Sequence, residues 1–155
     1  YGAWQRHPSP RPGDRENRIM SRKAKVLFVC VENSCRSQIA EAFANKLGKN
    51  VVEAWSAGSK PSGKVNEMAI QVMKEHDIDL GHHNSKGLSD LPKVEWDYVV
   101  TMGCGDACPF VPSKGKLDWN IPDPKSMPED EFRKVVGKIE QEVVLLSHRV
   151  IQERA

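Results

Sequence analysis

The sequence predicts an α/β fold of the doubly wound type, with a mainly parallel four-stranded sheet and helices on both faces. Short apolar runs typical of buried strands alternate along the chain with amphipathic segments of helical period. Strands that are separated by helices form βαβ units, and such units build parallel sheets. In these sheets, ligands bind beyond the carboxyl ends of the strands.

The first half of the domain contains two expected strands and two expected helices. Residues 25–29, with the sequence KVLFV, predict a buried strand, and residues 37–47 predict the helix after it. Residues 51–57 predict the second strand. In residues 65–76 the apolar side chains recur at i, i+3, i+4, i+7 and i+8, which indicates a second helix.

The second half continues the alternation. Residues 97–102 predict a third strand, and residues 116–121 predict a short fourth strand. The last helix is expected to begin with Ser126 as its N-cap, because Glu129 follows three residues later and Pro128 falls in the first turn.

The length and composition predict one domain behind an extension. The chain has 155 residues, enough for one ordinary domain. Residues 1–22 are rich in proline, arginine and polar residues and lack periodicity, so we expect a flexible N-terminal extension, with the domain at residues 23–155. Because 23 basic residues face 21 acidic ones, the net charge of +2 gives no reason to expect nucleic-acid or membrane binding.

The expected compartment is the cytoplasm, and we expect a monomer. No apolar run approaches the roughly 18 residues of a membrane helix. The N-terminal segment also lacks the apolar core of a signal peptide. In a reducing compartment, clustered cysteines indicate metal or redox chemistry rather than static disulfides.

The segment after the first strand, VCVENSCRS, has the pattern of an oxyanion site with a built-in nucleophile. Backbone N–H groups of a strand-to-helix loop can form an anion nest, and the helix dipole adds to the attraction. Arg36 offers two parallel donors to a tetrahedral oxyanion. A thiol in this field loses its proton easily, so we expect Cys30 to be a thiolate and Ser37 to donate its hydroxyl to the sulfur. The residues expected to bind the oxyanion are Val31, Glu32, Asn33, Ser34, Cys35 and Arg36.

A carboxylate is expected to face this loop from the segment IPDP. Asp123 lies between two prolines, so its loop is rigid and could hold the side chain over the anion site. A leaving oxygen needs a proton, and a carboxylic acid at this place could supply it.

Two further cysteines follow the third strand, in the segment TMGCGDACPF. Cys104 and Cys108 therefore belong to the same sheet edge as Cys30. A zinc site lacks partners, because only His82 and His83 are available and they are adjacent, so we expect no metal. Two inert cysteines are the other alternative, and a thiol–disulfide relay is favoured.

Together these residues resemble the thioredoxin-coupled arsenate reductases, which share the low-molecular-weight protein tyrosine phosphatase fold. The resemblance covers roughly residues 24–150. It rests on VCVENSCRSQIAEAF, WSAG, HDIDLGHHNS, VVTMGC followed by CP, and PDP, in that order. Gln38 stands where the phosphatases usually carry proline, and DPKS lacks the aromatic residues that usually follow their Asp-Pro. Both differences favour the reductase branch.

The resemblance implies a role for each residue of the oxyanion site. Cys30 would attack arsenate, Arg36 would bind its oxygens, and Ser37 would assist the thiolate. Asp123 would protonate the leaving oxygen. Cys35 would be a structural residue of the loop.

The resemblance also implies a cascade of three cysteines. Cys104 would attack the Cys30–arsenic adduct, releasing arsenite and leaving a disulfide. Cys108 would then form a disulfide with Cys104, and thioredoxin, or alternatively glutaredoxin with glutathione, would reduce it. Two thiols that become one disulfide supply the two electrons of the reduction, so no cofactor is expected.

Two positions depart from the family pattern. Some relatives bind potassium beside the loop, and Asn33, Glu41 and Ser56 match three of their ligands, but Lys86 stands at the fourth. We expect the ammonium group to take the place of the cation. Glu32 stands where many relatives have glycine, and a carboxylate near an anion nest is repulsive unless it points outward.

Two other function classes remain open. A low-molecular-weight phosphatase acting on phosphotyrosine or phosphoarginine would use the same Cys30, Arg36 and Asp123. A phosphoprotein-binding module on this scaffold could dispense with Cys30 or Asp123. The discriminating feature is the pair Cys104 and Cys108, because only the reductase needs it.

Overall fold

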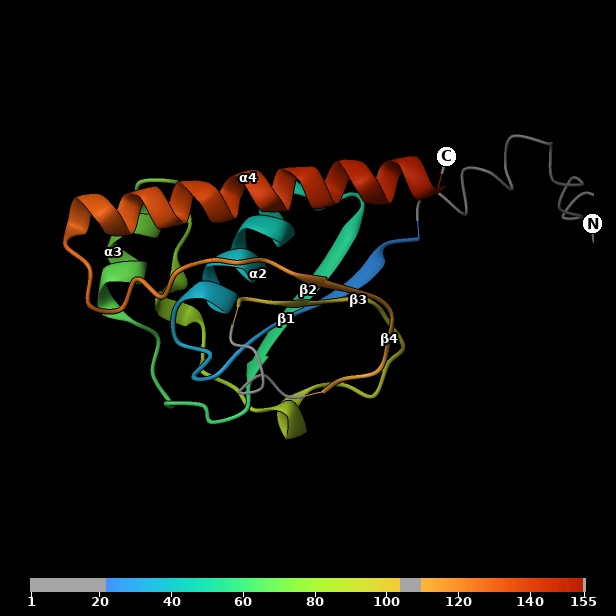
Figure 1. Cartoon of the computed structure of the whole chain (residues 1–155), viewed down its shortest axis with the longest axis horizontal. Helices are drawn as coiled ribbons and strands as arrows, with labels where there is room; N and C mark the ends of the chain where they lie inside the picture. Colours follow the sequence, from blue (N-terminus) through green and yellow to red (C-terminus); the bar gives the residue numbers. More distant parts are fainter. Residues whose placement is uncertain (1–21, 104–109, 155) are drawn as a thin grey trace, which may run out of the picture.

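The protein is described here by a computed structural model, which covers residues 22–103 and 110–154. The expected α/β class is confirmed: helices follow β1, β2 and β4 along the chain, and the strands form one parallel sheet (Figure 1). The expected extension, residues 1–22, lies outside the described residues except for its last residue. Cys104 and Cys108 also lie outside them. Within the described part, no helix is both long and apolar enough to span a bilayer.

The sheet has the strand order β2-β1-β3-β4. The strands are β1 (Ala24–Cys30), β2 (Val52–Gly58), β3 (Trp96–Thr101) and β4 (Ser113–Asp118), and every neighbouring pair is parallel. The chain passes from β1 to β2 on one side and then to β3 on the other. The topological switch point is therefore the carboxyl end of β1, which places Cys30 where ligands bind in such sheets.

The three α-helices pack into one large hydrophobic core on one face of the sheet. They are α2 (Arg36–Leu47), α3 (Glu67–Lys74) and α4 (Glu129–Arg154). Figure 1 shows α4 running along one side of the molecule with α2 beside it. Short 3₁₀ turns, η1 (Leu80–His82) and η2 (Leu88–Asp90), lie between α3 and β3.

The opposite face of the sheet has a smaller apolar cluster. Leu27 and Val29 of β1 point to this side, where Leu88 of η2 and the nearby Leu91 pack against them. Trp55 and Trp96 meet edge to face, with ring centroids 5.2 Å apart. Among the described residues, this face is thus covered by a 3₁₀ helix and loops rather than by a long helix.

Two element boundaries differ from the expectation. The fourth strand begins at Ser113, not at residue 116, and its alternating half-exposed residues carry little apolar signal. The last helix begins at Glu129, because the carbonyl of Pro128 accepts the N–H of Phe132 at 2.9 Å. Ser126 is therefore not the residue that opens this helix.

Gly58 at the end of β2 is required by close approach. A Cβ built there would lie 2.3 Å from the carbonyl oxygen of Val31 and 2.9 Å from the backbone nitrogen of Asn33. Both contacts are backbone atoms of the loop after Cys30, so neither can rotate away. Any side chain at this position displaces that loop.

We expect Gly58→Ala to lower the free energy of unfolding by about 1–3 kcal/mol, the usual range for overpacking. The matched control is Gly137→Ala in α4, where a Cβ meets nothing within 4 Å. This change should raise the free energy of unfolding by about 0.5–1 kcal/mol, because alanine restricts the unfolded chain and favours the helix. Urea denaturation measures both. Equal effects of the two substitutions would contradict the close approach at Gly58.

Candidate active site

Cys30 lies at the carboxyl end of β1, at the wall of a small cavity. The cavity has a volume of about 260 Å³. Its walls are formed by the loop after β1 and by the loop before α4, namely by Cys30, Val31, Glu32, Ser34, Cys35, Arg36, Asp123 and Lys125. Seven of these eight residues belong to the predicted site; Lys125 does not. We call this cavity the oxyanion pocket.

The hydrogen bonds around Cys30 have a defined direction. The backbone N–H of Lys86, which can only donate, points at Asn33 Oδ1 over 2.7 Å. This bond fixes the Asn33 amide, so its Nδ2 donates to Ser37 Oγ at 2.8 Å. Ser37 Oγ then has its own proton to give, and the Cys30 sulfur lies 2.8 Å away. An ionised Cys30 sulfur can only accept, so with a thiolate the Ser37 hydroxyl is the donor of this bond.

Asn33 also shapes the loop. It is fully buried, and its φ of 51° lies in the left-handed region, which asparagine tolerates better than most residues. Gln38 on α2 donates to the Asn33 side-chain oxygen at 2.9 Å and to the carbonyl of Asn84 at 2.8 Å. The loop is thus tied both to the helix that follows it and to the segment before η2.

The carbonyl groups of the loop bond to the surrounding segment. Backbone N–H groups of residues 60–66 donate to three of these carbonyls. The bonds run from Lys60 to Val31 at 2.8 Å, from Ser62 to Glu32 at 3.0 Å and from Asn66 to Ser34 at 2.8 Å. Carbonyls that bond outward leave the loop N–H groups for the concave side, which is the arrangement of an anion nest.

Arg36 is held in place by two backbone carbonyls. Its Nη1 donates to the carbonyl of Met102 at 2.7 Å and to that of Ile121 at 2.9 Å. Its Nη2 faces Asp123 Oδ2 at 4.0 Å. The guanidinium group is thus fixed before any ligand arrives, and Asp123 lies at the exposed rim of the same pocket.

Cys35 lies in the same loop but is suited to a structural role. Burial is the main cause that raises the pKa of its thiol to about 12. Negative charge on Asp123 and on Cys30 raises the pKa further, and Arg36 opposes the shift. Cys35 is therefore a neutral thiol at physiological pH.

The Lys86 ammonium lies beside Ser56 and Glu41, two of the three residues that match potassium ligands in the family resemblance. Its Nζ lies 3.5 Å from Ser56 Oγ, 3.7 Å from Glu41 Oε1 and 3.2 Å from the carbonyl of Asn84. Glu41 is buried, so an opposite charge beside it is required. The Lys86 ammonium group thus already supplies the positive charge beside these oxygens, so the residues do not fit a potassium ion.

Sequence reasoning missed two parts of the site. His83 Nδ1 lies 3.2 Å from both Glu41 Oε2 and Gln38 Oε1, which makes it the donor of this buried network. Lys125 lies 3.0 Å from each oxygen of Glu32, and this hydrogen bond raises the pKa of the Lys125 ammonium. The Glu32 carboxylate is therefore neutralised rather than left free beside the loop.

Comparison with known proteins points to one family. Residues 25–155 match the family model described as low molecular weight phosphotyrosine protein phosphatase. Arsenate reductase 1 of Staphylococcus epidermidis is 37% identical over 132 residues, which are 83% of this chain and 98% of that protein. The glutaredoxin arsenate reductase of a Synechocystis species is 36% identical over 77% of this chain and 92% of its own. The solved structure of a thioredoxin-dependent arsenate reductase of Corynebacterium glutamicum has 31% identity and a TM-score of 0.67, with 89% of this chain and 67% of that chain covered.

We expect iodoacetamide to modify Cys30 but not Cys35 in the folded protein, at pH 6 and at pH 8. Cys30 faces the pocket beside a hydroxyl donor, whereas the pKa of about 12 leaves Cys35 as a thiol. Inorganic phosphate should slow the reaction of Cys30. Peptide mass spectrometry measures both sites, and unfolding in urea at pH 8 is the control that exposes Cys35. Equal rates for the two thiols in the folded protein would refute this assignment.

Proposed function

The chain belongs to the low molecular weight phosphotyrosine protein phosphatase family, and we propose that it is an arsenate reductase of this family. The observation that carries the proposal is the oxyanion pocket, where a hydroxyl donor 2.8 Å from the Cys30 sulfur and the fixed Arg36 face a small cavity. Arsenate is a tetrahedral oxyanion of suitable size and charge. Its reduction requires thiols, and thiols are kept reduced in the cytoplasm, where we place the protein.

The first step is nucleophilic attack on arsenate. The Cys30 thiolate forms a bond to arsenic, and one arsenate oxygen leaves as water after protonation by Asp123. The Ser37 hydroxyl stabilises the thiolate before the attack. Arg36 and the loop N–H groups of residues 31–36 hold the remaining oxygens, which carry the negative charge throughout.

The second step transfers two electrons to arsenic. Cys104 attacks the Cys30 sulfur, the sulfur–arsenic bond breaks, and its electron pair leaves with arsenite. Cys104 is only two residues beyond Met102, whose carbonyl holds Arg36. Cys108 then attacks Cys104, which frees Cys30 as a thiol and leaves a Cys104–Cys108 disulfide.

Thioredoxin is the proposed reductant of this disulfide. A chain with its own resolving thiol finishes the turnover with an intramolecular disulfide, which is the substrate of a dithiol reductant. Glutaredoxin with glutathione is the alternative, and one relative carries that name. Consumption of NADPH in the presence of arsenate, with each reductant system supplied separately, distinguishes the two.

Hydrolysis of phosphate esters is the second candidate activity. The family model is that of a phosphatase, and the same Cys30, Arg36 and Asp123 would perform ester cleavage. Such an activity needs neither Cys104 nor Cys108. We propose it as a weak side activity, because the residues after Asp123 and Pro124 are Lys125 and Ser126 and offer no aromatic surface to a tyrosyl group.

We expect Asp123→Asn to lower the rate of the first arsenite release by roughly 100-fold or more, the usual range for general acid catalysis. Phosphate affinity should not fall, because the amide removes a negative charge from the pocket rim. A single-turnover assay with excess protein measures the rate, and protection of Cys30 by phosphate measures binding. An unchanged rate would leave Asp123 with a structural role only.

We expect Cys108→Ser to release one arsenite per protein and then to stop, because a hydroxyl does not attack a disulfide under these conditions. The stalled protein should contain Cys30 joined to Cys104, detected by peptide mass after alkylation. Cys104→Ser should release little arsenite. Both variants should hydrolyse an aryl phosphate as the wild type does. Multiple turnovers of Cys108→Ser with thioredoxin as sole reductant would overturn the cascade.

A further inference from the structure

An ion pair between Glu32 and Lys125 joins the two walls of the oxyanion pocket. Glu32 belongs to the loop after β1, and Lys125 follows Asp123 on the opposite wall. The Lys125 Nζ lies 3.0 Å from each carboxylate oxygen of Glu32. From this geometry we propose that Lys125 is a further ligand of the oxyanion. In this proposal Glu32 pairs with the Lys125 ammonium group when no oxyanion is bound.

The charges of the pocket support this role. Counted with every acid and base ionised, before Asp123 takes up the proton that it later donates, the lining side chains carry two positive charges, on Arg36 and Lys125, and two negative charges, on Glu32 and Asp123. Without Lys125 these side chains would sum to one negative charge, before the Cys30 thiolate is counted. A doubly charged oxyanion would then enter a repulsive pocket. Lys125 therefore removes one unit of the negative charge that the entering anion would otherwise meet.

Arg36 alone is poorly placed to supply this attraction. Its Nη1 is already bonded to the carbonyls of Met102 and Ile121, and its Nη2 faces the Asp123 carboxylate. Lys125, in contrast, has one side-chain partner, Glu32, among the described residues. Both side chains of the pair are well exposed, 56% for Lys125 and 40% for Glu32. Exposed pairs are weak, so a bound dianion can compete with Glu32 for the ammonium group.

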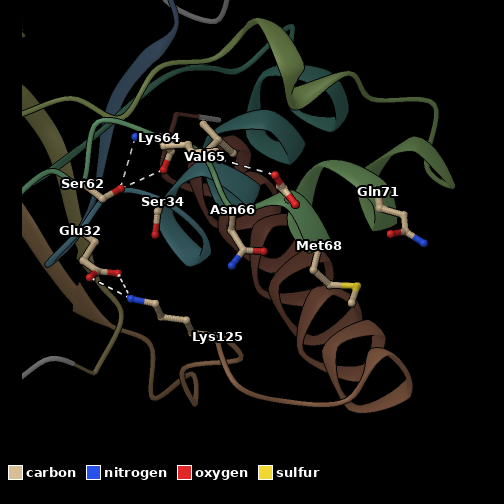
Figure 2. A pocket seen from close by; sticks show the side chains of 10 residues that line it. Glu32, Ser34, Ser62, Lys64, Val65, Asn66, Met68, Gln71 and Lys125 are labelled. Atoms are coloured by element: carbon tan, nitrogen blue, oxygen red, sulfur yellow. Dashed lines mark hydrogen bonds and ion pairs between the residues drawn. The ribbon is translucent and has the colours of Figure 1, made fainter.

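The surroundings of Lys125 leave it room to turn. A larger cavity of about 660 Å³ lies beside the oxyanion pocket and shares Glu32, Ser34 and Lys125 with it. Figure 2 shows the Lys125 side chain extended toward Glu32, with Ser34 nearby and Asn66 and Met68 farther along the wall. The ammonium group thus lies at the boundary of two cavities. Lys125 therefore borders the oxyanion pocket as well as the larger cavity.

A merely structural ion pair makes a different prediction. If the pair only braced the two walls, removal of either partner would weaken oxyanion binding in the same direction. If Lys125 is a ligand that Glu32 competes for, the two removals act in opposite directions. The sign of the two effects therefore decides between these roles.

The test is the dissociation constant of inorganic phosphate, measured as protection of Cys30 from iodoacetamide. We expect Lys125→Ala to weaken phosphate binding by about threefold to tenfold, the effect of one exposed charge. Glu32→Gln should tighten binding by about twofold to fivefold, because the ammonium group is released. The double variant should lie between the single variants, and Lys125→Arg should retain wild-type affinity.

The matched control is Lys64→Ala. Lys64 forms a pair with Glu67, 3.5 Å apart, that is more exposed than the Lys125–Glu32 pair, and it lines only the neighbouring cavity. Its removal should change the phosphate affinity by less than about twofold, since exposed charges are screened over distance. Weaker binding in both Glu32→Gln and Lys125→Ala, or no change in Lys125→Ala, would overturn the proposal.

This inference rests on the proposed function only in that the pocket takes a tetrahedral oxyanion. Phosphate binding requires no reduction, so the test does not depend on Cys104, Cys108 or a reductant. A chain that binds phosphate with the expected signs but does not reduce arsenate would refute the proposed function alone. If the protein reduces arsenate but Glu32→Gln and Lys125→Ala both weaken phosphate binding, the inference alone is refuted.

Discussion

The hydrogen bond from the Lys86 backbone to the Asn33 side chain is the constraint on which the site depends. Because a backbone N–H can only donate, this bond orients the Asn33 amide, which then donates to Ser37 Oγ and leaves the Ser37 proton available to a Cys30 thiolate. The same amide oxygen accepts from Gln38. One backbone bond thus orients the side chains around the nucleophile. Lys86 is held in place for it because the N–H of Gly58, at the end of β2, donates to the Lys86 carbonyl at 2.9 Å.

The parts of the site that sequence reasoning found are those carried by neighbouring residues. Cys30, Arg36 and Ser37 follow one another within eight positions, and the strand before them and the helix after them are read from local apolar spacing. Asp123 is recognised because it lies between two prolines in a chain that also carries the loop from Cys30 to Arg36. Local chemistry and local periodicity were enough for these residues, and for the order of strands and helices that brings them to one sheet edge.

The missed parts depend on contacts between distant segments. Lys125 meets Glu32 across 93 positions, and His83 meets Gln38 across 45, so neither pair has a local signature. The fourth strand was misplaced because it is an edge strand of half-exposed residues, whereas the buried Trp119 and Ile121 that follow it look like a strand in the sequence. The expected ammonium at Lys86 is present beside Glu41, and that expectation came from the family resemblance rather than from spacing.

The anchoring of Arg36 has a thermodynamic consequence. One nitrogen of its guanidinium group donates to the carbonyl of Met102, directly after β3, and to that of Ile121, two residues before Asp123. The Arg36 side chain therefore connects these two segments to the oxyanion pocket. If these bonds hold Arg36 in the geometry that binds the oxyanion, then loosening either carbonyl lowers the affinity for the oxyanion, and by linkage a bound oxyanion stabilises both bonds by the same free energy. Oxyanion binding and the local order of these two segments are then thermodynamically coupled.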